Sequence, residues 1–369
     1  MLLAAGGTGG HLFVAEALAH ELIARGYTVH LATDGRAARY ASGFPAEQTH
    51  VIPSATFAGK NPFVLAKALL DLSRGFMRSS ALIRRLKPVA VVGFGGYPTL
   101  PPLFAASRMD VPTLIHDANA VMGRANRWLS SRVDLVAMGF EGGFEAAGQG
   151  EVVVTGNPVR PAILEAAKRP YPDRKANEAF NLLVFGGSQG AQYFGQALPA
   201  AIGLIDARTR KLLDIVQQAR PEDEASVAAT YRDLGVKAEV APFFADMADR
   251  LAAAHLVIAR GGAGTVSELA VIGRPAILVP YPYALDHDQK MNAASMAEAG
   301  GAWIELQKDL TPQKLAKMIE EAIADPAGLA LAAKKAKKAG KPDATQRLAD
   351  CVERIAAGGK AGDFRGIRT

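Results

Sequence analysis

LLAAGGTGGHLFVAEALAHELIARGYTVHLA, residues 2–32, joins a short apolar run to a glycine-rich turn and then to a longer apolar pattern. In this longer pattern, Leu12, Leu18 and Leu22 fall on one face at helical spacing. Gly26 follows the pattern, and glycine readily takes the left-handed conformation that ends many helices. A second apolar run begins at Tyr27. The order strand, glycine turn, helix, strand predicts a βαβ unit with parallel strands.

The same alternation continues along the chain and predicts an α/β protein with two doubly wound parallel sheets. We expect strands near 1–5, 27–33, 50–53, 89–93, 112–116, 133–138 and 151–155, and a second series near 181–186, 211–217, 238–243, 255–259, 276–280 and 302–306. Four prolines and frequent charges between 156 and 180 indicate a linker, and a last helix is expected at 343–357.

Composition narrows the class of protein. A length of 369 residues with 49% hydrophobic residues predicts two globular domains. Cys351 is the only cysteine, which fits a reducing compartment, and the N-terminus lacks the pattern of a secretory signal. Glycines and prolines interrupt the long uncharged stretch 88–107, so it does not read as a membrane span.

The formal net charge of +6 fits phosphorylated substrates, an anionic membrane or nucleic acid, but no nucleic-acid motif occurs. The lysine run in 334–341 is expected to be a solvated helix face.

Glycine clusters follow four of the predicted strands: GGTGGH at 6–11, GFGGY at 93–97, GGSQGA at 186–191 and GGAGT at 261–265. Open α/β sheets bind ligands at these strand ends, where glycine lets backbone N–H groups approach an anion and the next helix adds its positive end. No P-loop sequence is present. The spacing also differs from the nicotinamide fingerprint, although Asp34 lies near the position of its acidic residue.

With these motifs the chain resembles the MurG family of UDP-N-acetylglucosamine (UDP-GlcNAc) transferases over almost its whole length. The resemblance rests on the four clusters and on the following segments: His116–Asn119, MGRAN at 122–126, GNPVR at 156–160, TVSE at 265–268, and DHDQ at 286–289 with Asn292. It implies a GT-B fold, in which two Rossmann-like domains face a central cleft. Residues 1–157 with 343–369 would form the acceptor domain, and residues 158–342 the UDP-GlcNAc domain.

The implied reaction is an inverting transfer of GlcNAc to the C4 hydroxyl of N-acetylmuramic acid (MurNAc) in undecaprenyl-pyrophosphoryl-MurNAc-pentapeptide (lipid I). The product would be lipid II, a precursor of peptidoglycan, so the family implies a part in cell-wall synthesis, cell shape and cell division. The family also implies attachment to the cytoplasmic face of the inner membrane and no cofactor.

The family's site residues carry over by motif. The expected catalytic residues are His11, Asp117 and Asn119. The expected donor residues are Thr8, Gly9, Gly10, Asn119, Arg160, Ser188, Gln189, Phe244, Ala263, Gly264, Thr265, Val266, Ser267, Glu268, Asp288 and Gln289. The expected acceptor residues are Gly93, Gly95, Gly96, Tyr97, His116 and Asn126.

His11 is the expected general base, because it lies where the loop joins the helix and imidazole titrates near neutrality. The alternative is a histidine that only shapes the loop or holds the acceptor. Direct inversion needs no nucleophilic side chain. Asp286-His-Asp288 spells a metal-binding pattern, but acidic residues are also favourable at a helix start without any metal, and we expect none.

Residues 61–87 interleave apolar and basic residues, which suits docking on an anionic bilayer. The alternative is an amphipathic helix whose apolar side faces the core.

Two further functions stay open: another GT-B enzyme acting on UDP-GlcNAc, such as a 2-epimerase or a transferase with a different acceptor, and a membrane-associated binding protein with weakened catalysis. The binding protein is supported only by the altered segment 116–119. The sequence departs from the family pattern at Val14, Asp117, Ala118, Gly261, Gly264 and Tyr283, and these departures bear on how active the enzyme is. The sequence does not predict the oligomeric state.

Overall fold

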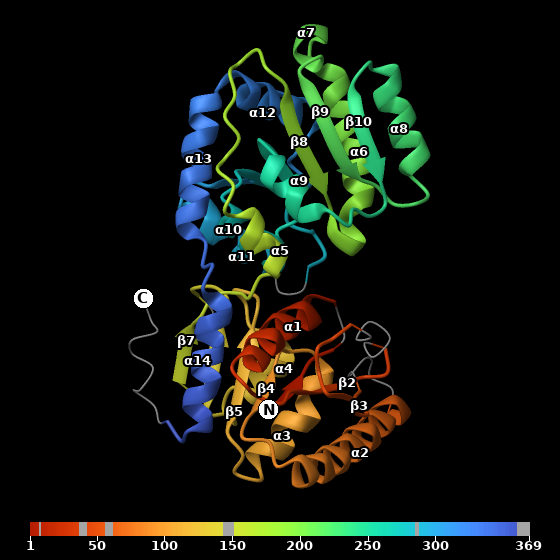
Figure 1. The fold of residues 1–369 in the computed structure, drawn as a ribbon. Coiled ribbons are helices and arrows are strands. Elements are labelled where there is room, and N and C mark those ends of the chain that lie inside the picture. The colour runs from red at the N-terminus through yellow and green to blue at the C-terminus, as the bar shows by residue number, and fades with distance from the viewer. Residues whose placement is uncertain (7–8, 37–42, 56–61, 143–150, 285–287, 360–369) are drawn as a thin grey trace. The chain divides into compact units, whose positions relative to one another are not determined.

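A computed structural model describes the chain except residues 7–8, 37–42, 56–61, 143–150, 285–287 and 360–369. It divides into two compact units, Met1–Arg160 with Pro342–Thr369, and Pro161–Lys341 (Figure 1). The boundaries expected from the sequence, 157/158 and 342/343, lie within three residues of these divisions.

Within the described residues, the first unit contains a seven-stranded parallel sheet of order β3-β2-β1-β4-β5-β6-β7. Its strands are β1 (Leu2–Ala4), β2 (His30–Thr33), β3 (Gln48–Val51), β4 (Val91–Gly93), β5 (Thr113–Asp117), β6 (Leu135–Met138) and β7 (Glu151–Val154). Each overlaps a run expected from the sequence. The order steps outward from β1 in both directions, which is the doubly wound arrangement that the βαβ pattern predicts.

Helices cover both faces of this sheet (Figure 1). The helices are α1 (Gly9–Ala24), α2 (Pro62–Leu86), the short 3-10 helix η2 (Tyr97–Thr99), α3 (Leu100–Ser107), α4 (Arg124–Leu129) and α14 (Ala344–Ala356). Helices α1 and α14 share one apolar core, and α2, α3 and α4 share the other. Arg25, directly after α1, pairs with Asp350 and Glu353 on α14 at 2.6 Å, so the C-terminal helix packs in the first unit.

The second unit repeats this arrangement with a six-stranded parallel sheet of order β10-β9-β8-β11-β12-β13 among the described residues. Its strands are β8 (Phe180–Phe185), β9 (Leu213–Gln218), β10 (Lys237–Ala241), β11 (Leu256–Ala259), β12 (Ala276–Leu278) and β13 (Ala302–Ile304). Its helices are α5 (Pro161–Ala166), α6 (Gly187–Leu204), α7 (Ala207–Arg210), α8 (Glu224–Asp233), α9 (Met247–Ala253), α10 (Ala263–Ile272), α11 (Asp288–Glu298), α12 (Pro312–Ala324) and α13 (Pro326–Ala339). Helix α5 lies inside the expected linker 156–180, because proline is tolerated in the first turn of a helix and Pro161 begins this one.

The parallel sheets bring the glycine clusters together at their carboxyl edges. In the first unit, Ala4 of β1 pairs with Gly93 of β4, so the first two clusters follow neighbouring strands. In the second unit, Phe185 of β8 pairs with Ala259 of β11, so the last two clusters do the same. Each unit therefore carries its own candidate half-site.

A buried histidine makes the stability of the protein depend on pH. His255 lies against the second sheet, where its Nδ1 accepts the N–H of Asn181 at 2.8 Å. Burial, with Arg174 and Arg274 nearby, lowers the pKa of His255 to about 4 from an ordinary value of 6.5. The unfolded chain therefore binds a proton as the pH falls below 6.5, whereas the folded chain does not do so until near 4, and stability is lost across that window.

We expect His255→Asn, which keeps an acceptor for Asn181, to remove part of this dependence. Between pH 7 and pH 5 the wild type should lose about 2 kcal/mol more of its free energy of unfolding than the variant. Urea unfolding at both pH values measures the difference. Equal losses in the two proteins would show that His255 is already protonated in the folded state.

Candidate functional site

The first half-site surrounds His11, in the first turns of α1. Its Nδ1 lies 3.1 Å from the carbonyl oxygen of Gly6. Because a carbonyl only accepts, Nδ1 carries the proton and Nε2 carries the lone pair. A Cβ added at Gly95 would lie 3.3 Å from Nε2, and one at Gly96 would lie 3.5 Å from Nδ1. Both glycines have positive φ, +89° and +74°, so the loop lies against the imidazole in a conformation that favours glycine.

Asp117 organises the loop after β5 and is only 4% exposed. Its Oδ1 accepts the N–H of Asn119 at 3.0 Å. Its Oδ2 accepts the N–H of Gly123 at 2.9 Å and Nδ2 of Asn126 at 3.0 Å. Burial raises the pKa of Asp117, and the three donors and nearby His11 oppose that rise by stabilising the carboxylate. The carboxylate thus holds the loop and α4 in one arrangement beside His11.

His116 and Asn157 tie this loop to the chain after β7. Nε2 of His116 donates to the carbonyl of Gly156 at 3.2 Å, and burial lowers the pKa of His116 to about 4, so the ring is neutral at pH 7. Nδ2 of Asn157 donates to the carbonyl of Ala118 at 2.9 Å. These contacts position the segment, so the structure supports a positioning role for His116.

The structure separates Gly93 from its neighbours in the acceptor prediction. A Cβ at Gly93 would lie 2.3 Å from the Thr99 side chain and 2.9 Å from Leu103, so this glycine allows β4 to pack closely on η2 and α3. Neighbouring side chains thus fill the space beside the Gly93 α-carbon, and contact between Gly93 and the acceptor stays a prediction. The other predicted acceptor residues lie close to His11 or to the loop after β5. Gly95 and Gly96 lie against His11, Tyr97 follows them, and Asn126 donates to Asp117.

The second half-site lies where α6 and α10 begin. Helix α6 starts at Gly187, directly after β8, so Ser188 and Gln189 occupy its first turn. Helix α10 starts at Ala263, and helical geometry leaves the first N–H groups without intrahelical acceptors. The positive ends of two helices thus follow adjacent strands, which is an arrangement suited to anions.

Val266 lies in the core of the second unit, and its contact with the donor stays a prediction. Its side chain is 1% exposed, and its N–H donates to the carbonyl of Gly262 within α10. Ala263, Gly264 and Thr265 precede it in the first turn of α10. Ser267 and Glu268, in the next turn, are half-buried.

The first turn of α11 packs directly on the loop before α10. A Cβ at Gly261 would lie 2.4 Å from the carbonyl oxygen of Gln289, so only glycine fits at this contact. Nδ2 of Asn292 donates to the carbonyl of Gly261 at 3.3 Å. Oε1 of Gln289 accepts the N–H of Tyr281 at 2.8 Å, which directs its amide nitrogen away from that bond. Asp288 is the first residue of α11.

Arg260 lies beneath this loop and is 6% exposed. Its guanidinium donates to the carbonyl of Val279 and to Gln307, and it lies 5.1 Å from the ring of Phe194. These contacts fix Arg260, and with it the start of the loop between β11 and α10. Phe244 is also buried, under the guanidinium of Arg250 at 4.3 Å, so its backbone is the part that a ligand could reach.

The structure describes six further expected site residues only in part or not at all. Arg160 ends the first unit. Thr8 lies outside the described residues, and so do the side chains of Ser188 and Gln189. Gly9 and Gly10 begin α1.

No group of three or more His, Cys, Asp or Glu side chains among the described residues could hold a metal ion. Of the two carboxylates in the Asp286-His-Asp288 pattern, only Asp288 belongs to the described residues. Asp286 lies in the segment 285–287, which the structure does not describe.

Comparison with known proteins follows the same division. The model of the glycosyltransferase family 28 N-terminal domain matches residues 1–138, and that of the C-terminal domain matches 181–348. A protein of Chelativorans sp. (strain BNC1) is 58% identical over 369 residues, which is 100% of this chain and 98% of that protein. Its name is UDP-N-acetylglucosamine--N-acetylmuramyl-(pentapeptide) pyrophosphoryl-undecaprenol N-acetylglucosamine transferase. A protein of the same name from Rhizobium rhizogenes is 57% identical over 99% of this chain and 98% of its own.

The chain belongs to the MurG family. The crystal structure of MurG from Acinetobacter baumannii is similar to it, with a TM-score of 0.79 and 30% identity over 96% of this chain and 98% of that one. The two parallel-sheet units are those of a GT-B fold, and the protein is a glycosyltransferase.

Some residues that position the half-site of this MurG-family chain are not indicated by the sequence motifs. Thr99 donates its hydroxyl to the carbonyl of Gly95 at 2.7 Å and so holds the loop beside His11. No spacing signal marks Thr99, because its partner is a backbone atom. Val14, where the family pattern usually has proline, is 7% exposed and packs in the core with α14, so this departure lies outside the half-site.

Proposed function

We propose that this protein transfers GlcNAc from UDP-GlcNAc to the C4 hydroxyl of the MurNAc-pentapeptide carried on undecaprenyl pyrophosphate. The observation that supports it most is the pairing of two different half-sites on one chain. One presents an imidazole lone pair beside a glycine loop, and the other presents two adjacent helix N-termini. With the names of the 57–58% identical relatives, this pairing favours an acceptor in the first unit and a donor in the second.

In the proposed reaction, His11 Nε2 takes the proton of the acceptor hydroxyl as its oxygen attacks the anomeric carbon. The bond from that carbon to the UDP oxygen breaks, and the diphosphate leaves with the electron pair. Backbone N–H groups at the starts of α6 and α10 stabilise the charge that develops on it. The attack is direct, so the anomeric configuration inverts and no covalent intermediate forms.

Gln289 and Asp288 are proposed to recognise the sugar. Because Oε1 of Gln289 accepts from Tyr281, the amide presents donors, which pair with sugar oxygens. The carboxylate of Asp288 only accepts and so pairs with sugar hydroxyl hydrogens. Neither role requires a metal or another cofactor. By the same proposal the product enters peptidoglycan, and loss of the enzyme affects cell shape and division.

The test is to identify the product of UDP-GlcNAc labelled in its sugar, with and without a lipid-linked MurNAc-pentapeptide. Label in a lipid-linked disaccharide, together with released UDP, supports the proposal. An epimerised sugar formed without acceptor would identify a 2-epimerase. Binding of UDP-GlcNAc with no turnover under either condition would indicate the binding protein.

Gly261→Ala tests the donor half-site. The added Cβ meets the Gln289 carbonyl at 2.4 Å and must push the start of α11 away from α10. We expect the KM for UDP-GlcNAc to rise about ten-fold, equivalent to about 1.4 kcal/mol of lost binding, with the KM for the acceptor unchanged. Gly203→Ala is the control, because its Cβ meets Leu234 at an ordinary 3.7 Å. A donor KM unchanged by Gly261→Ala would contradict the proposed role of this contact.

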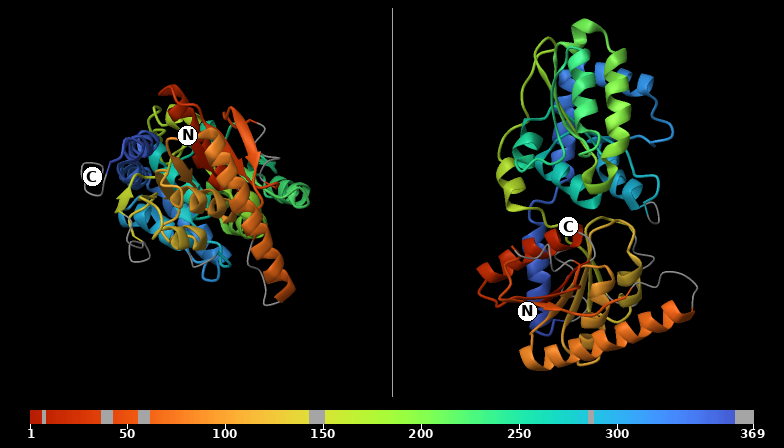
Figure 2. Two further views of the ribbon diagram at one scale, coloured as in Figure 1. Left: turned by 90° about the horizontal axis from the view of Figure 1, so that it is seen from below. Right: turned by 90° about the vertical axis from the view of Figure 1, so that its right-hand side faces the viewer.

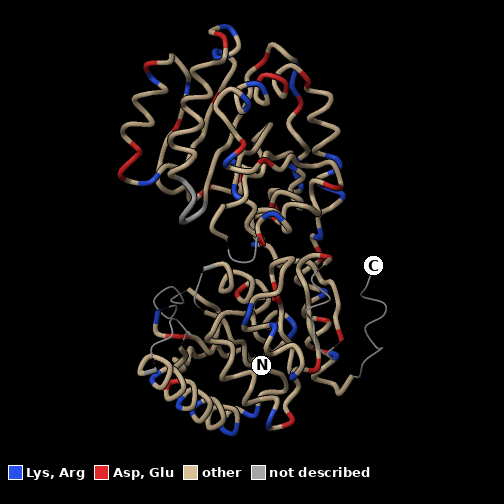
Figure 3. The backbone as a smooth tube through the Cα atoms, turned by 180° about the vertical axis from the view of Figure 1, so that it is seen from behind, with Lys and Arg blue, Asp and Glu red and all other residues tan. Residues whose placement is uncertain are grey.

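We further propose that α2 docks the protein on an anionic membrane at the cytoplasmic face. No helix in the described residues is long and apolar enough to span a bilayer. Helix α2 buries Ala68, Leu82 and Ile83, whereas Phe63 is 84% exposed and Met77 is 61% exposed. Its sequence holds five basic residues and a single acid, spaced along the helix in Figure 3. Figure 2 shows its N-terminal half extending past the sheet of the first unit.

Phe63→Asp is expected to weaken binding to vesicles containing an anionic phospholipid by about ten-fold or more, because burial of a Phe side chain contributes about 1.5–3 kcal/mol. Leu331→Asp, at a 54% exposed position on α13, is the matched control and should change nothing. Co-sedimentation with anionic and with neutral vesicles measures both. Equal binding of Phe63→Asp and wild type would exclude this face of α2.

A further inference from the structure

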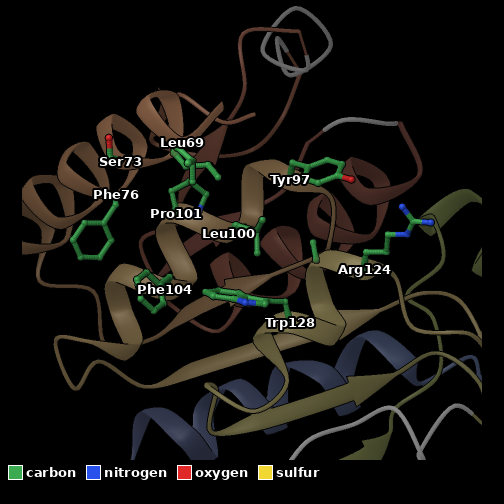
Figure 4. A pocket seen from close by; sticks show the side chains of 11 residues that line it. Leu69, Ser73, Phe76, Tyr97, Leu100, Pro101, Phe104, Arg124 and Trp128 are labelled. Atoms are coloured by element: carbon green, nitrogen blue, oxygen red, sulfur yellow. The ribbon is translucent and has the colours of Figure 1, made fainter. Parts of the chain in front are cut away.

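An apolar cavity of about 630 Å³ lies within the first unit, between α2, the segment from η2 to α3, and α4. Its size is in the range of small-molecule sites, about 300–1,000 Å³. The lining side chains include Leu69, Ser73, Phe76, Tyr97, Phe104 and Trp128 (Figure 4). The proposed reaction uses none of these as a reacting group.

The cavity has an apolar and a polar end. Phe104 lies between Phe76 and Trp128, with ring centroids 5.5 and 5.4 Å apart, and these rings form a packed aromatic wall. Tyr97 and Arg124 lie at the other side in Figure 4, and the guanidinium of Arg124 points away from the apolar side chains. This polarity matches a ligand with an apolar chain and an anionic head.

The polar end is continuous in sequence with the acceptor half-site. Tyr97 follows Gly95 and Gly96, which lie against His11. Ala125 precedes Asn126, which donates to Asp117. The same two segments therefore line the cavity on one side and shape the half-site on the other.

We propose that this cavity binds the first isoprene units of the acceptor's polyprenyl chain, with the pyrophosphate lying between it and His11. The inference rests on the proposed function and assigns a chain subsite to the same acceptor. A polyprenyl chain suits it because each relative named above is described as acting on a pyrophosphoryl-undecaprenol, in which the chain is joined directly to the anionic group. A bilayer phospholipid is the competing occupant. Its acyl chains would bind without affecting a soluble acceptor.

The test uses soluble acceptors with five-, ten- and fifteen-carbon prenyl chains, below their micelle concentrations and without membranes or detergent. Burying each five-carbon unit removes several methylene-sized groups from water, so the wild-type KM should fall about ten-fold or more from the five- to the fifteen-carbon acceptor. A KM independent of chain length would overturn the inference. Absence of turnover with every acceptor would instead overturn the proposed function on which it rests.

Ser73→Trp separates the cavity from general membrane docking. Ser73 is exposed at the cavity mouth, and its hydroxyl donates to the carbonyl of Leu70 in its own helix, so a larger side chain fills the cavity without removing core packing. We expect the KM for the fifteen-carbon acceptor to rise about ten-fold, toward that for the five-carbon one. We also expect kcat and the KM for UDP-GlcNAc to stay unchanged. Vesicle binding should not decrease, because the indole adds apolar surface.

Met77→Trp is the matched control, because it adds the same indole at an exposed position of α2 that does not line the cavity. It should keep the wild-type dependence on chain length. If Ser73→Trp also keeps that dependence, the prenyl chain does not bind in the cavity. If it lowers vesicle binding and leaves the acceptor KM values unchanged, the cavity holds a bilayer lipid and the inference is overturned.

Discussion

His11→Ala is expected to lower kcat about 10²–10⁴-fold, the range lost when a general base is removed, while the KM for UDP-GlcNAc changes little. The tautomer of His11 is the reason for expecting it to act as the base. Nδ1 donates to the Gly6 carbonyl, so the lone pair lies on Nε2, on the side where Gly95 approaches. A histidine that only shaped the loop would affect folding or acceptor binding more than kcat.

Steady-state kinetics as a function of pH measure the effect. The wild-type rate should fall at low pH, as the base becomes protonated, and the residual rate of His11→Ala should lack that limb. His20→Ala is the control, because His20 is exposed on the same helix. Full turnover by His11→Ala, or the same acidic limb in the variant, would contradict the assignment of the base.

Asp117→Ala is expected to lower the free energy of unfolding by about 3 kcal/mol and kcat at least about ten-fold, because it removes the buried carboxylate that three donors share, one of which, the amide of Asn126, is itself buried. These donors are the N–H groups of Asn119 and Gly123 and the amide of Asn126. Asp117→Asn keeps the shape but turns one acceptor into a donor facing other donors, so we expect it to lower both quantities as well.

Urea unfolding and kinetics on the same preparations separate the two effects. Asp134→Ala is the control, since Asp134 accepts the N–H and hydroxyl of Thr113 in the same unit but lies outside the half-site. It should lose stability and keep kcat. If Asp117→Ala were as stable as wild type, or no less active than Asp134→Ala, Asp117 would not organise the catalytic loop.

The sequence predicts the fold well because the signals are local. Strands and helices alternate along most of the described chain, glycine clusters follow four of the strands, and the observed strands overlap all the expected runs. The positions of the glycine clusters follow from parallel strand order. Roles within a cluster do not, because they depend on backbone direction: Gly95 has φ +89° and meets His11, whereas Gly93, two residues earlier, packs on Thr99.

Other features of the site depend on side-chain packing, which the sequence pattern does not show. Helical periodicity marks α10 as apolar but does not show that the Val266 side chain is in the core while the first turn of the same helix presents N–H groups. The alternation in 61–87 likewise fits both an inward and an outward apolar face. The structure shows both faces, because Leu82 and Ile83 are buried whereas Phe63 and Met77 are exposed, and membrane docking stays a proposal.

The central claim is a single displacement at the anomeric carbon, with His11 taking the proton and UDP leaving. NMR of the disaccharide formed from UDP-α-GlcNAc and a MurNAc-pentapeptide acceptor tests it most directly, together with the amount of UDP released. We expect a β linkage and one UDP per disaccharide. An α linkage, or UDP released without disaccharide, would contradict it.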